Sequence, residues 1–196
     1  MAPTTETRPA LSIVIVSWNV RRLLLRAIQS IHRAWSKEWR GLEIIVVDNG
    51  STDGTVESVR AQFPDVHLIA NPHNAGFTGG NNQGIRVSKG KLVLLLNPDT
   101  EVKGNALSTL IGYLDAHPKV GLVGPQLQNP NGTVQPSRRR FPTLPVLFLE
   151  STWLQGLMPN SILRRYYVQD RSPKSVQKVD WVTGAAMMVR RGRGEG

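Results

Sequence analysis

The feature that most constrains the fold of this sequence is a regular alternation of apolar strands and amphipathic helices between residues 11 and 124. Leu11–Val16 and Leu42–Val47 are short runs rich in β-branched residues, which is typical of strands buried on both faces. Between them, Val20–Trp35 carries apolar residues at helical spacing with arginines in between. Such chains form a mostly parallel sheet with helices on both faces, so the sequence predicts an α/β fold.

The alternation continues beyond the second strand. The further elements predicted by spacing and turn residues are a helix through Val56 and Phe63 capped by Ser51 or Thr52, a strand at Val66–Ala70, a helix at Thr78–Ser88, a strand at Lys91–Leu96, a helix at Ala106–His117 and a strand at Val120–Gly124. After Gly124 the pattern loosens: residues 126–145 predict a long loop or hairpin, and 146–157 a short helix.

Polar clusters follow the predicted strands, at Asn19, Asp48–Asp53, Asn71–Asn74 and Asn97–Asp99. In parallel sheets ligands bind at the carboxyl ends of the strands, where the strand order reverses. We therefore expect these four clusters to gather along one edge of the sheet and to form the binding site.

Two carboxylates in these clusters suggest binding chemistry. Asp48 comes directly after a buried strand, where a turn needs no carboxylate, so we expect it to accept hydrogen bonds from a base or ribose. Asp53, by contrast, is expected to cap the following helix. Asp99 follows Pro98, which fixes the turn, and a carboxylate there can hold a divalent cation together with diphosphate oxygens. Taken alone, Asn97-Pro-Asp99 also fits a plain turn.

The segment Asn71–Gly84 is rich in asparagine and glycine. Small residues allow a ligand or a second backbone to approach closely, and amide side chains both donate and accept hydrogen bonds. No Gly-Lys-Ser/Thr follows, which excludes a Walker loop, and the absence of Gly-x-Gly-x-x-Gly after the first strand disfavours a dinucleotide fold.

Composition narrows the function classes. The 196 residues contain no cysteine, which excludes a disulfide scaffold, a cysteine-ligated zinc site and a thiol nucleophile. The net charge of +10 is concentrated in residues 131–196, with 11 basic against 4 acidic side chains. That excess indicates an anionic partner such as nucleic acid, anionic lipid headgroups or pyrophosphate, or simply a solvated basic surface. Residues 1–10 are polar and lack the apolar core of a secretion signal, and no apolar run is long enough to cross a bilayer, so we expect a disordered N-terminus and a cytoplasmic protein.

Taken together, the sequence resembles the family 2 glycosyltransferases of GT-A fold, and most of all their bacterial rhamnosyltransferase-like subgroup. The matching segments occur in the family's order and are residues 12–19, 44–54, 71–84, 94–100 and 182–190. The combination of Asp48-Asn-Gly-Ser-Thr-Asp53 with a downstream Asn-Pro-Asp is specific to this family.

The resemblance implies a role for each matching position. Asp48 would contact the nucleobase, and Asp99 would bind Mg²⁺ or Mn²⁺ on the diphosphate. Asn97 stands where many members have Asp, so its contact to ribose or sugar is through an amide. The other positions implied in nucleotide-sugar binding are Asn19, Asn74, Gly76 and Asn82, and those on the acceptor side are Thr183, Gly184 and Ala185.

The resemblance also divides the chain. It implies a nucleotide-sugar-binding GT-A subdomain at 11–125, a partial acceptor-side subdomain at 126–191 and an aberrant tail at 192–196. In the family, the general base belongs to a Glu-Asp pair after this point, and Glu195 does not match it. We therefore expect the base to lie beyond Arg191 and to be missing here. The isolated chain is then expected either to bind a nucleoside diphosphate weakly or to fold poorly, and to show little or no sugar transfer.

The function implied is transfer of a sugar from a donor of dTDP-rhamnose or UDP-sugar type to a saccharide or polyprenyl-diphosphate-linked acceptor in cell-wall or surface polysaccharide synthesis. The basic residues Arg138–Arg140 and Arg164–Arg165, with Tyr166–Tyr167, are candidates for peripheral contact at the inner face of the membrane.

Two alternatives remain open at this point. A nucleotidyltransferase would have a Gly-rich signature with Arg and Lys near the first strand, which Ser17-Trp-Asn19 lacks. A basic nucleic-acid-binding protein would interleave aromatic residues for stacking, but Phe, Trp and Tyr make up only 6% of the chain. We expect no nucleic acid partner.

Overall fold

The computed structural model describes residues 8–35, 41–141, 143, 146, 160–168, 171–172 and 175–192. The chain divides into two compact units. The first consists of Met1–Val123 and Gly184–Gly196, and the second of Gly124–Thr183. Among the described residues, no helix has the length and apolarity needed to cross a bilayer.

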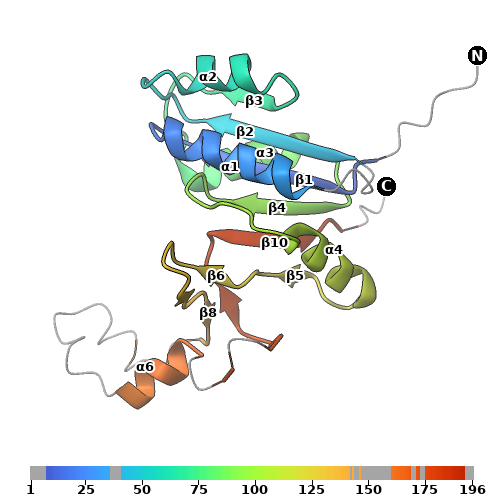
Figure 1. Ribbon diagram of the computed structural model, residues 1–196, viewed down its shortest axis with the longest axis vertical. Coiled ribbons are helices and arrows are strands. Elements are labelled where there is room, and N and C mark those ends of the chain that lie inside the picture. The colour runs from blue at the N-terminus through green and yellow to red at the C-terminus, as the bar shows by residue number, and fades with distance from the viewer. Residues whose placement is uncertain are drawn as a thin grey trace, which may run out of the picture. The chain divides into compact units, whose positions relative to one another are not determined.

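The first unit is built on a six-stranded sheet of order β3-β2-β1-β4-β10-β5 (Figure 1). Its strands are β1 (Leu11–Ser17), β2 (Leu42–Asp48), β3 (His67–Ala70), β4 (Leu92–Leu96), β5 (Leu122–Val123) and β10 (Ala186–Arg190). The pairs β3-β2, β2-β1 and β1-β4 are parallel, whereas β10 runs antiparallel to β4 and β5. The predicted α/β fold with a mostly parallel sheet is confirmed.

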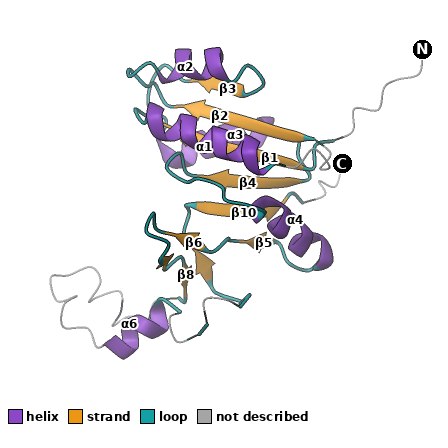
Figure 2. Ribbon diagram, viewed as in Figure 1, coloured by secondary structure: helices purple, strands orange, loops and turns teal. Residues whose placement is uncertain are grey.

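Helices cover both faces of this sheet, as Figure 2 shows, with α1 and α4 in front and α3 behind. They are α1 (Arg21–Ala34), α2 (Thr55–Gln62), α3 (Gly76–Val87) and α4 (Ala106–Ala116), and α2 packs along β3 and α1. Each predicted helix of this unit is present, with boundaries within about two residues except at the start of α2.

Two glycines of α3 bring that helix directly onto β1. A Cβ at Gly80 would lie 2.8 Å from a methyl of Val16, and a Cβ at Gly84 would overlap a methyl of Val14. The valines of this face belong to a core cluster that Ile85 of α3 completes. At Gly80 and Gly84, therefore, the small residues make room for the valine side chains of β1 rather than for a ligand. The helix also starts earlier than predicted, at Gly76.

Two consecutive arginines, the last residue of β10 and the one that follows it, hold the ends of helices on opposite faces of the sheet (Figure 2). Arg190 donates to the carbonyl of Leu114 in α4 at 2.6 Å. Arg191 donates to the carbonyls of Ser88 and of Ile85, the latter at 3.1 Å, at the end of α3. Cations at helix C-termini satisfy the last carbonyls and oppose the negative end of the helix dipole.

The observed units differ from the predicted division at β10. The prediction assigned residues 126–191 to an acceptor-side part, but Gly184–Gly196 belong to the first unit because β10 pairs between β4 and β5. The predicted disordered segment 1–10 also differs where it is described, since the carbonyl of Pro9 accepts from the N–H of Lys91 at 2.9 Å.

The second unit is made of short elements. The predicted hairpin is present as β6 (Leu127–Gln128) paired with β7 (Val134–Gln135), and β8 (Arg138–Arg139) pairs with β9 (Trp181–Val182). Helix α6 spans Asn160–Tyr166. The predicted helix at 146–157 and the predicted tail at 192–196 lie outside the described residues except for Val146 and Gly192.

Arg139 packs within this second unit. Its guanidinium carbon lies 4.2 Å from the ring centroid of Tyr167 and 5.8 Å from those of Tyr166 and Trp181. The same side chain donates to the carbonyl of Pro136 at 2.8 Å. Because its guanidinium packs against three aromatic rings, Arg139 is a weaker candidate for membrane contact than the sequence implies.

Candidate functional site

The structure brings the polar clusters to one edge of the sheet, as the alternation predicts. Ser17 at the end of β1 is the register partner of Asp48 at the end of β2, and Asp48 is paired in turn with Ala70. On the other side of β1, Ile15 pairs with Leu96, so the loop after β4 starts level with the end of β1. Because paired strands lie ~4.8 Å apart, the carboxyl ends of β2 and β4 are ~10 Å apart across β1.

Asp48 and Ser17 each carry an unpaired buried oxygen at this edge. Asp48 is 1% exposed, and its Oδ2 accepts from the N–H of Ser51 at 2.8 Å, but its Oδ1 has no hydrogen-bond partner among the described residues. Ser17 is equally buried, and its Oγ likewise has no partner. Buried polar atoms are nearly always paired, and leaving one unpaired costs about 1–3 kcal/mol. The two atoms are therefore candidates to bind a ligand that brings its own donor and acceptor.

Asn19 joins the loops that follow β1 and β2. Its N–H donates to Ser51 Oγ at 2.8 Å, and its Oδ1 accepts from the N–H of Thr52 at 2.8 Å. Asn19 takes a positive φ of 54°, which asparagine tolerates better than most residues. Asn19 is implied in nucleotide-sugar binding, but its amide oxygen is engaged in holding the two loops together. Ser51 and Thr52 serve this contact, so their predicted role as helix caps is wrong.

Asp53 fixes the starts of two helices. Its Oδ2 accepts from the N–H of Arg21 in α1 at 3.0 Å, and its Oδ1 accepts from the N–H of Thr55 in α2 at 3.2 Å and from the Thr55 hydroxyl. The hydroxyl bond is the main cause that lowers the pKa of Asp53 below its ordinary value of 3.8. Asp53 thus orders the start of α2, but the N-cap position is Gly54 rather than Asp53, and α2 begins at Thr55, later than expected.

A partly buried network of amides links the end of β2 to α3. Asn49, 2% exposed, donates from Nδ2 to the carbonyl of Gly76 at 3.1 Å. Asn71 Nδ2 donates to Asn49 Oδ1 at 3.0 Å and to Gln83 Oε1 at 2.8 Å. The sequence analysis named neither Asn49 nor Gln83 as a functional residue. For Asn49 the sequence does contain a signal, namely its position directly after a buried strand.

Of the predicted donor-pocket residues, Asn74 precedes α3, Gly76 begins it and Asn82 lies in its middle. Asn74, Gly76 and Asn82 are all exposed, and Asn74 Oδ1 accepts from the N–H of Gly76 at 2.8 Å. A Cβ at Gly76 would meet no atom within 4 Å. Gly76 therefore borders open space at the start of α3.

Asp99 lies on the loop between β4 and α4. It is exposed, and the Thr100 hydroxyl is 3.4 Å from its Oδ1. The N–H of Thr100 bonds to the carbonyl of Asn97 at 3.1 Å and closes a turn around Pro98. The N–H of Asn97 bonds to the carbonyl of Ala185 at 2.9 Å, which fixes the start of the loop to the strand beside it.

The predicted acceptor-side residues separate between the two units. Gly184 and Ala185 directly precede β10, and its first residue, Ala186, pairs with the last residue of β4, so Ala185 lies beside the start of the Asp99 loop. Thr183 belongs to the second unit, where its N–H and its hydroxyl both donate to the carbonyl of Ser137 at 2.9 Å.

The donor set at this edge fits a divalent cation that is shared with a ligand. Among the described residues there is no group of three or more His, Cys, Asp or Glu side chains able to enclose a metal. Asp99 offers one exposed carboxylate. Mg²⁺ and Mn²⁺ commonly bind through one or two carboxylates and complete their shell with substrate phosphates and water. Asp99 therefore fits a cation bound together with a diphosphate.

Positive charge is available at the same edge. Helix α1 begins with Arg21 and Arg22, which are both exposed. The start of a helix carries a partial positive charge and attracts phosphate groups. Neither these arginines nor Ser17 is predicted as a site residue from the sequence, because the arginines follow the Ser17-Trp-Asn19 turn and belong to the basic face of a helix.

Comparison with known proteins agrees with this geometry. The model of a family described as "Glycosyl transferase family 2" matches residues 12–190. An N-acetylglucosaminyl-diphospho-decaprenol L-rhamnosyltransferase of Mycobacterium tuberculosis is 28% identical over 193 residues, covering 92% of this chain and 61% of the relative. A GalNAc(5)-diNAcBac-PP-undecaprenol beta-1,3-glucosyltransferase of Campylobacter jejuni is 33% identical over 107 residues, covering 53% of this chain and 34% of the relative.

A solved structure shares the fold. The mannosyltransferase PcManGT of Pyrobaculum calidifontis, in complex with GDP-Man and Mn²⁺, aligns with a TM-score of 0.54 at 25% identity over 64% of this chain and 37% of that one. The chain spans about three fifths of the length of its mycobacterial relative. With the sheet, the carboxyl-edge site and a family match over residues 12–190, the chain belongs to glycosyl transferase family 2 and has its GT-A fold.

Proposed function

We propose that this chain binds a pyrimidine nucleotide-sugar at the carboxyl edge of its sheet, and that the protein transfers the sugar to a lipid-linked saccharide in cell-wall or surface glycan synthesis. Family membership supports sugar transfer over the nucleotidyltransferase alternative. The acceptor class follows from the mycobacterial and Campylobacter relatives, whose names give diphospho-decaprenol- and PP-undecaprenol-linked acceptors.

The observation that carries the proposal is the unpaired Oδ1 of Asp48 beside the unpaired Oγ of Ser17. Because Oδ2 already accepts from Ser51, Asp48 has one oxygen left, and the hydroxyl of Ser17 can donate. Uracil and thymine present one N–H between two carbonyls, which matches one acceptor beside one donor. Guanine presents two adjacent donors, which would suit a carboxylate with both oxygens open. Both protein atoms are buried, so this mode of binding requires a local rearrangement that exposes them to the base.

The diphosphate would lie between the start of α1 and the Asp99 loop. Asp99 would hold Mg²⁺ or Mn²⁺ on the phosphate oxygens, and the cation would neutralise the departing nucleoside diphosphate. Arg21 and Arg22 add positive charge at the helix start. In this proposal Asn97 contacts the ribose or sugar, and the remaining roles are donor-pocket lining by Asn74, Gly76 and Asn82 and acceptor contact by Gly184 and Ala185.

A lipid-linked acceptor would bring the protein to a membrane surface. The second unit holds eight basic and three acidic residues, and Arg164 and Arg171 are exposed. Anionic headgroups attract such basic segments by about 1 kcal/mol per residue near the surface. We therefore include peripheral contact at the inner leaflet in the proposal, through these arginines rather than through Arg139.

Isothermal calorimetry with UDP, dTDP and GDP, each with and without Mn²⁺, tests the proposal. We expect UDP or dTDP to bind more tightly than GDP and to gain affinity from Mn²⁺. Asp99→Asn should remove the gain, whereas Asp115→Asn, which changes an exposed aspartate of α4, should not. A chain that binds none of these nucleotides, or binds duplex DNA more tightly than any of them at moderate salt, would refute it.

A further inference from the structure

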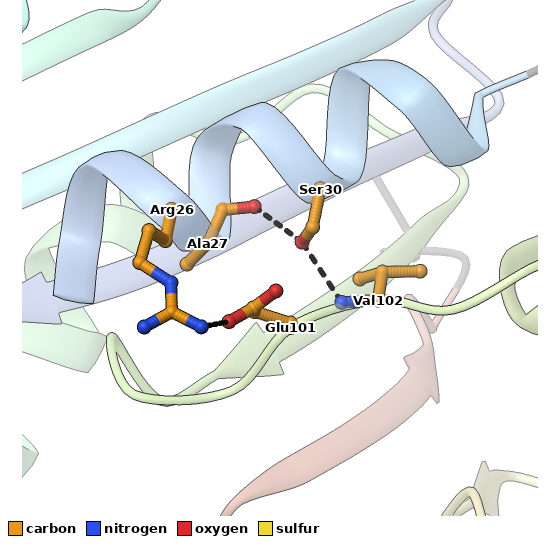
Figure 3. A network of polar contacts seen from close by, with 5 residues as sticks. All are labelled: Arg26, Ala27, Ser30, Glu101 and Val102. Atoms are coloured by element: carbon orange, nitrogen blue, oxygen red, sulfur yellow. Dashed lines mark hydrogen bonds and ion pairs between the residues drawn. The ribbon is translucent and has the colours of Figure 1, made fainter. Parts of the chain in front are cut away.

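Two residues of the Asp99 loop are fixed to helix α1 (Figure 3). Glu101 forms an ion pair with Arg26. The N–H of Val102 donates to Ser30 Oγ at 2.8 Å, and Ser30 Oγ donates to the carbonyl of Ala27 at 2.7 Å. The hydroxyl of Ser30 thus acts as a donor within its helix and as an acceptor for the loop.

Ser30 provides the stronger of these two anchors. It is 2% exposed, whereas the side chains of Arg26 and Glu101 are 63% and 34% exposed. An N–H that loses its acceptor away from water costs more free energy than an exposed ion pair contributes. The loop position should therefore depend more on the Ser30 hydroxyl than on the ion pair.

The other end of α1 is attached to the loop after β2. The N–H of Arg21 bonds to Asp53, and Asn19, just before the helix, bonds to Ser51 and Thr52. From Arg21 to Ser30 the helix rises about 14 Å. Helix α1 therefore connects the loop that follows Asp48 to the loop that carries Asp99.

We propose that Ser30 is a positioning residue for metal binding: through Val102 it holds the loop so that Asp99 meets the cation on the diphosphate of a nucleotide whose base lies at Asp48. The inference rests on the proposed function. It explains in addition how the distance between the carboxylates of Asp48 and Asp99 is set. It predicts that loss of the Ser30 hydroxyl weakens the metal-dependent part of nucleotide binding and leaves the metal-free part intact.

The test compares the affinity of the full chain for UDP and for dTDP, with and without Mn²⁺, in Ser30→Ala, Ser30→Thr and Ser88→Ala. Ser88 is a matched control: it is 4% exposed and its Oγ donates to the carbonyl of Ile85 at 2.7 Å, but at the end of α3. We expect Ser30→Ala to keep metal-free affinity within about two-fold and to reduce the gain from Mn²⁺ roughly ten-fold. Ser30→Thr, which retains a hydroxyl, should recover most of that gain, and Ser88→Ala should keep all of it.

The outcomes separate this inference from the proposed function. If the wild-type chain gains no affinity from Mn²⁺, the metal role of Asp99 fails, and the inference fails with it. If the wild type gains affinity and Ser30→Ala gains as much, only the inference is overturned. It is also overturned if Ser30→Ala loses metal-free and metal-dependent binding alike, because that pattern indicates a general loss of structure.

Discussion

Replacing Asp48 by asparagine should stabilise the unliganded protein and weaken nucleotide binding. Asparagine has the same shape, and its carbonyl oxygen can still accept the bond from the N–H of Ser51. The amide nitrogen then occupies the position of the unpaired Oδ1. A neutral amide costs less to bury than a carboxylate oxygen without a partner, so the free energy of unfolding should rise.

The structure sets the size of both effects. Relief of one unpaired buried oxygen is worth about 1–3 kcal/mol, and because the new amide is itself unpaired we expect about 1 kcal/mol of added stability. A hydrogen bond from a base to a charged group is worth about 1.5–3 kcal/mol, so affinity for UDP or dTDP should fall roughly ten- to 150-fold. The amide would also turn a donor toward the N–H of the base.

Urea unfolding without nucleotide, followed by tryptophan fluorescence, gives the change in stability, and calorimetry gives the change in affinity. Asp115→Asn on α4 is the matched control, because it removes an exposed carboxylate and should change neither quantity measurably. The argument is wrong if Asp48→Asn destabilises the free protein, or if it binds the nucleotide as tightly as the wild type does.

Three further predictions follow from packing, capping and stacking. Gly84→Ala, whose new methyl would overlap a valine of β1, should lower the free energy of unfolding measured in urea by about 1–3 kcal/mol. Gly112→Ala, whose new methyl would meet no atom within 4 Å, should raise it by up to about 1 kcal/mol. Equal responses of the two variants would contradict the packing argument. Because the pKa of Asp53 is lowered in the folded state, its carboxylate stabilises the fold at pH above 3.8, and this contribution is lost as the pH falls through the folded-state pKa. The melting temperatures of the wild type and of Asp53→Asn should therefore differ at neutral pH and converge in acid. A difference that stays constant with pH would exclude this linkage. Arg139→Ala should remove about 1 kcal/mol of stacking on Tyr167, at 4.2 Å, and speed limited proteolysis of the second unit, while unchanged cleavage would mean that the stack contributes little.

The sequence predicts local elements better than it predicts strand partners. The strands and helices between residues 11 and 124 follow from periodicity, because periodicity records which side of each element is buried. The family resemblance places residues 186–190 in the acceptor-side part. Their strand, β10, pairs antiparallel with β4 and β5, and no local pattern encodes which distant strands a segment joins.

Within the site, the sequence cannot show how each oxygen is used. Asn19, Asp53 and Asn74 are polar residues in turns at the same edge as Asp48, and each accepts a bond from a backbone N–H nearby. For Asn19 this use competes with the nucleotide contact implied by resemblance. The hydrogen bonds of the folded chain are needed to distinguish residues that build the loops from residues with an atom free to bind a ligand.

Asp48 and Asp53 show how the hydrogen bonds of a carboxylate change the interpretation of its function. In the sequence, Asp48 stands out because a turn needs no carboxylate directly after a strand. In the structure, Asp48 nevertheless orders its turn, through the N–H of Ser51. The difference lies in the second oxygen: both oxygens of Asp53 accept bonds, whereas Oδ1 of Asp48 accepts none. Since the Ser51 bond and burial fix the Asp48 carboxylate before any ligand arrives, little conformational entropy remains to be lost on binding. The bond that gives Asp48 a structural role is also the one that orients its free oxygen for the base.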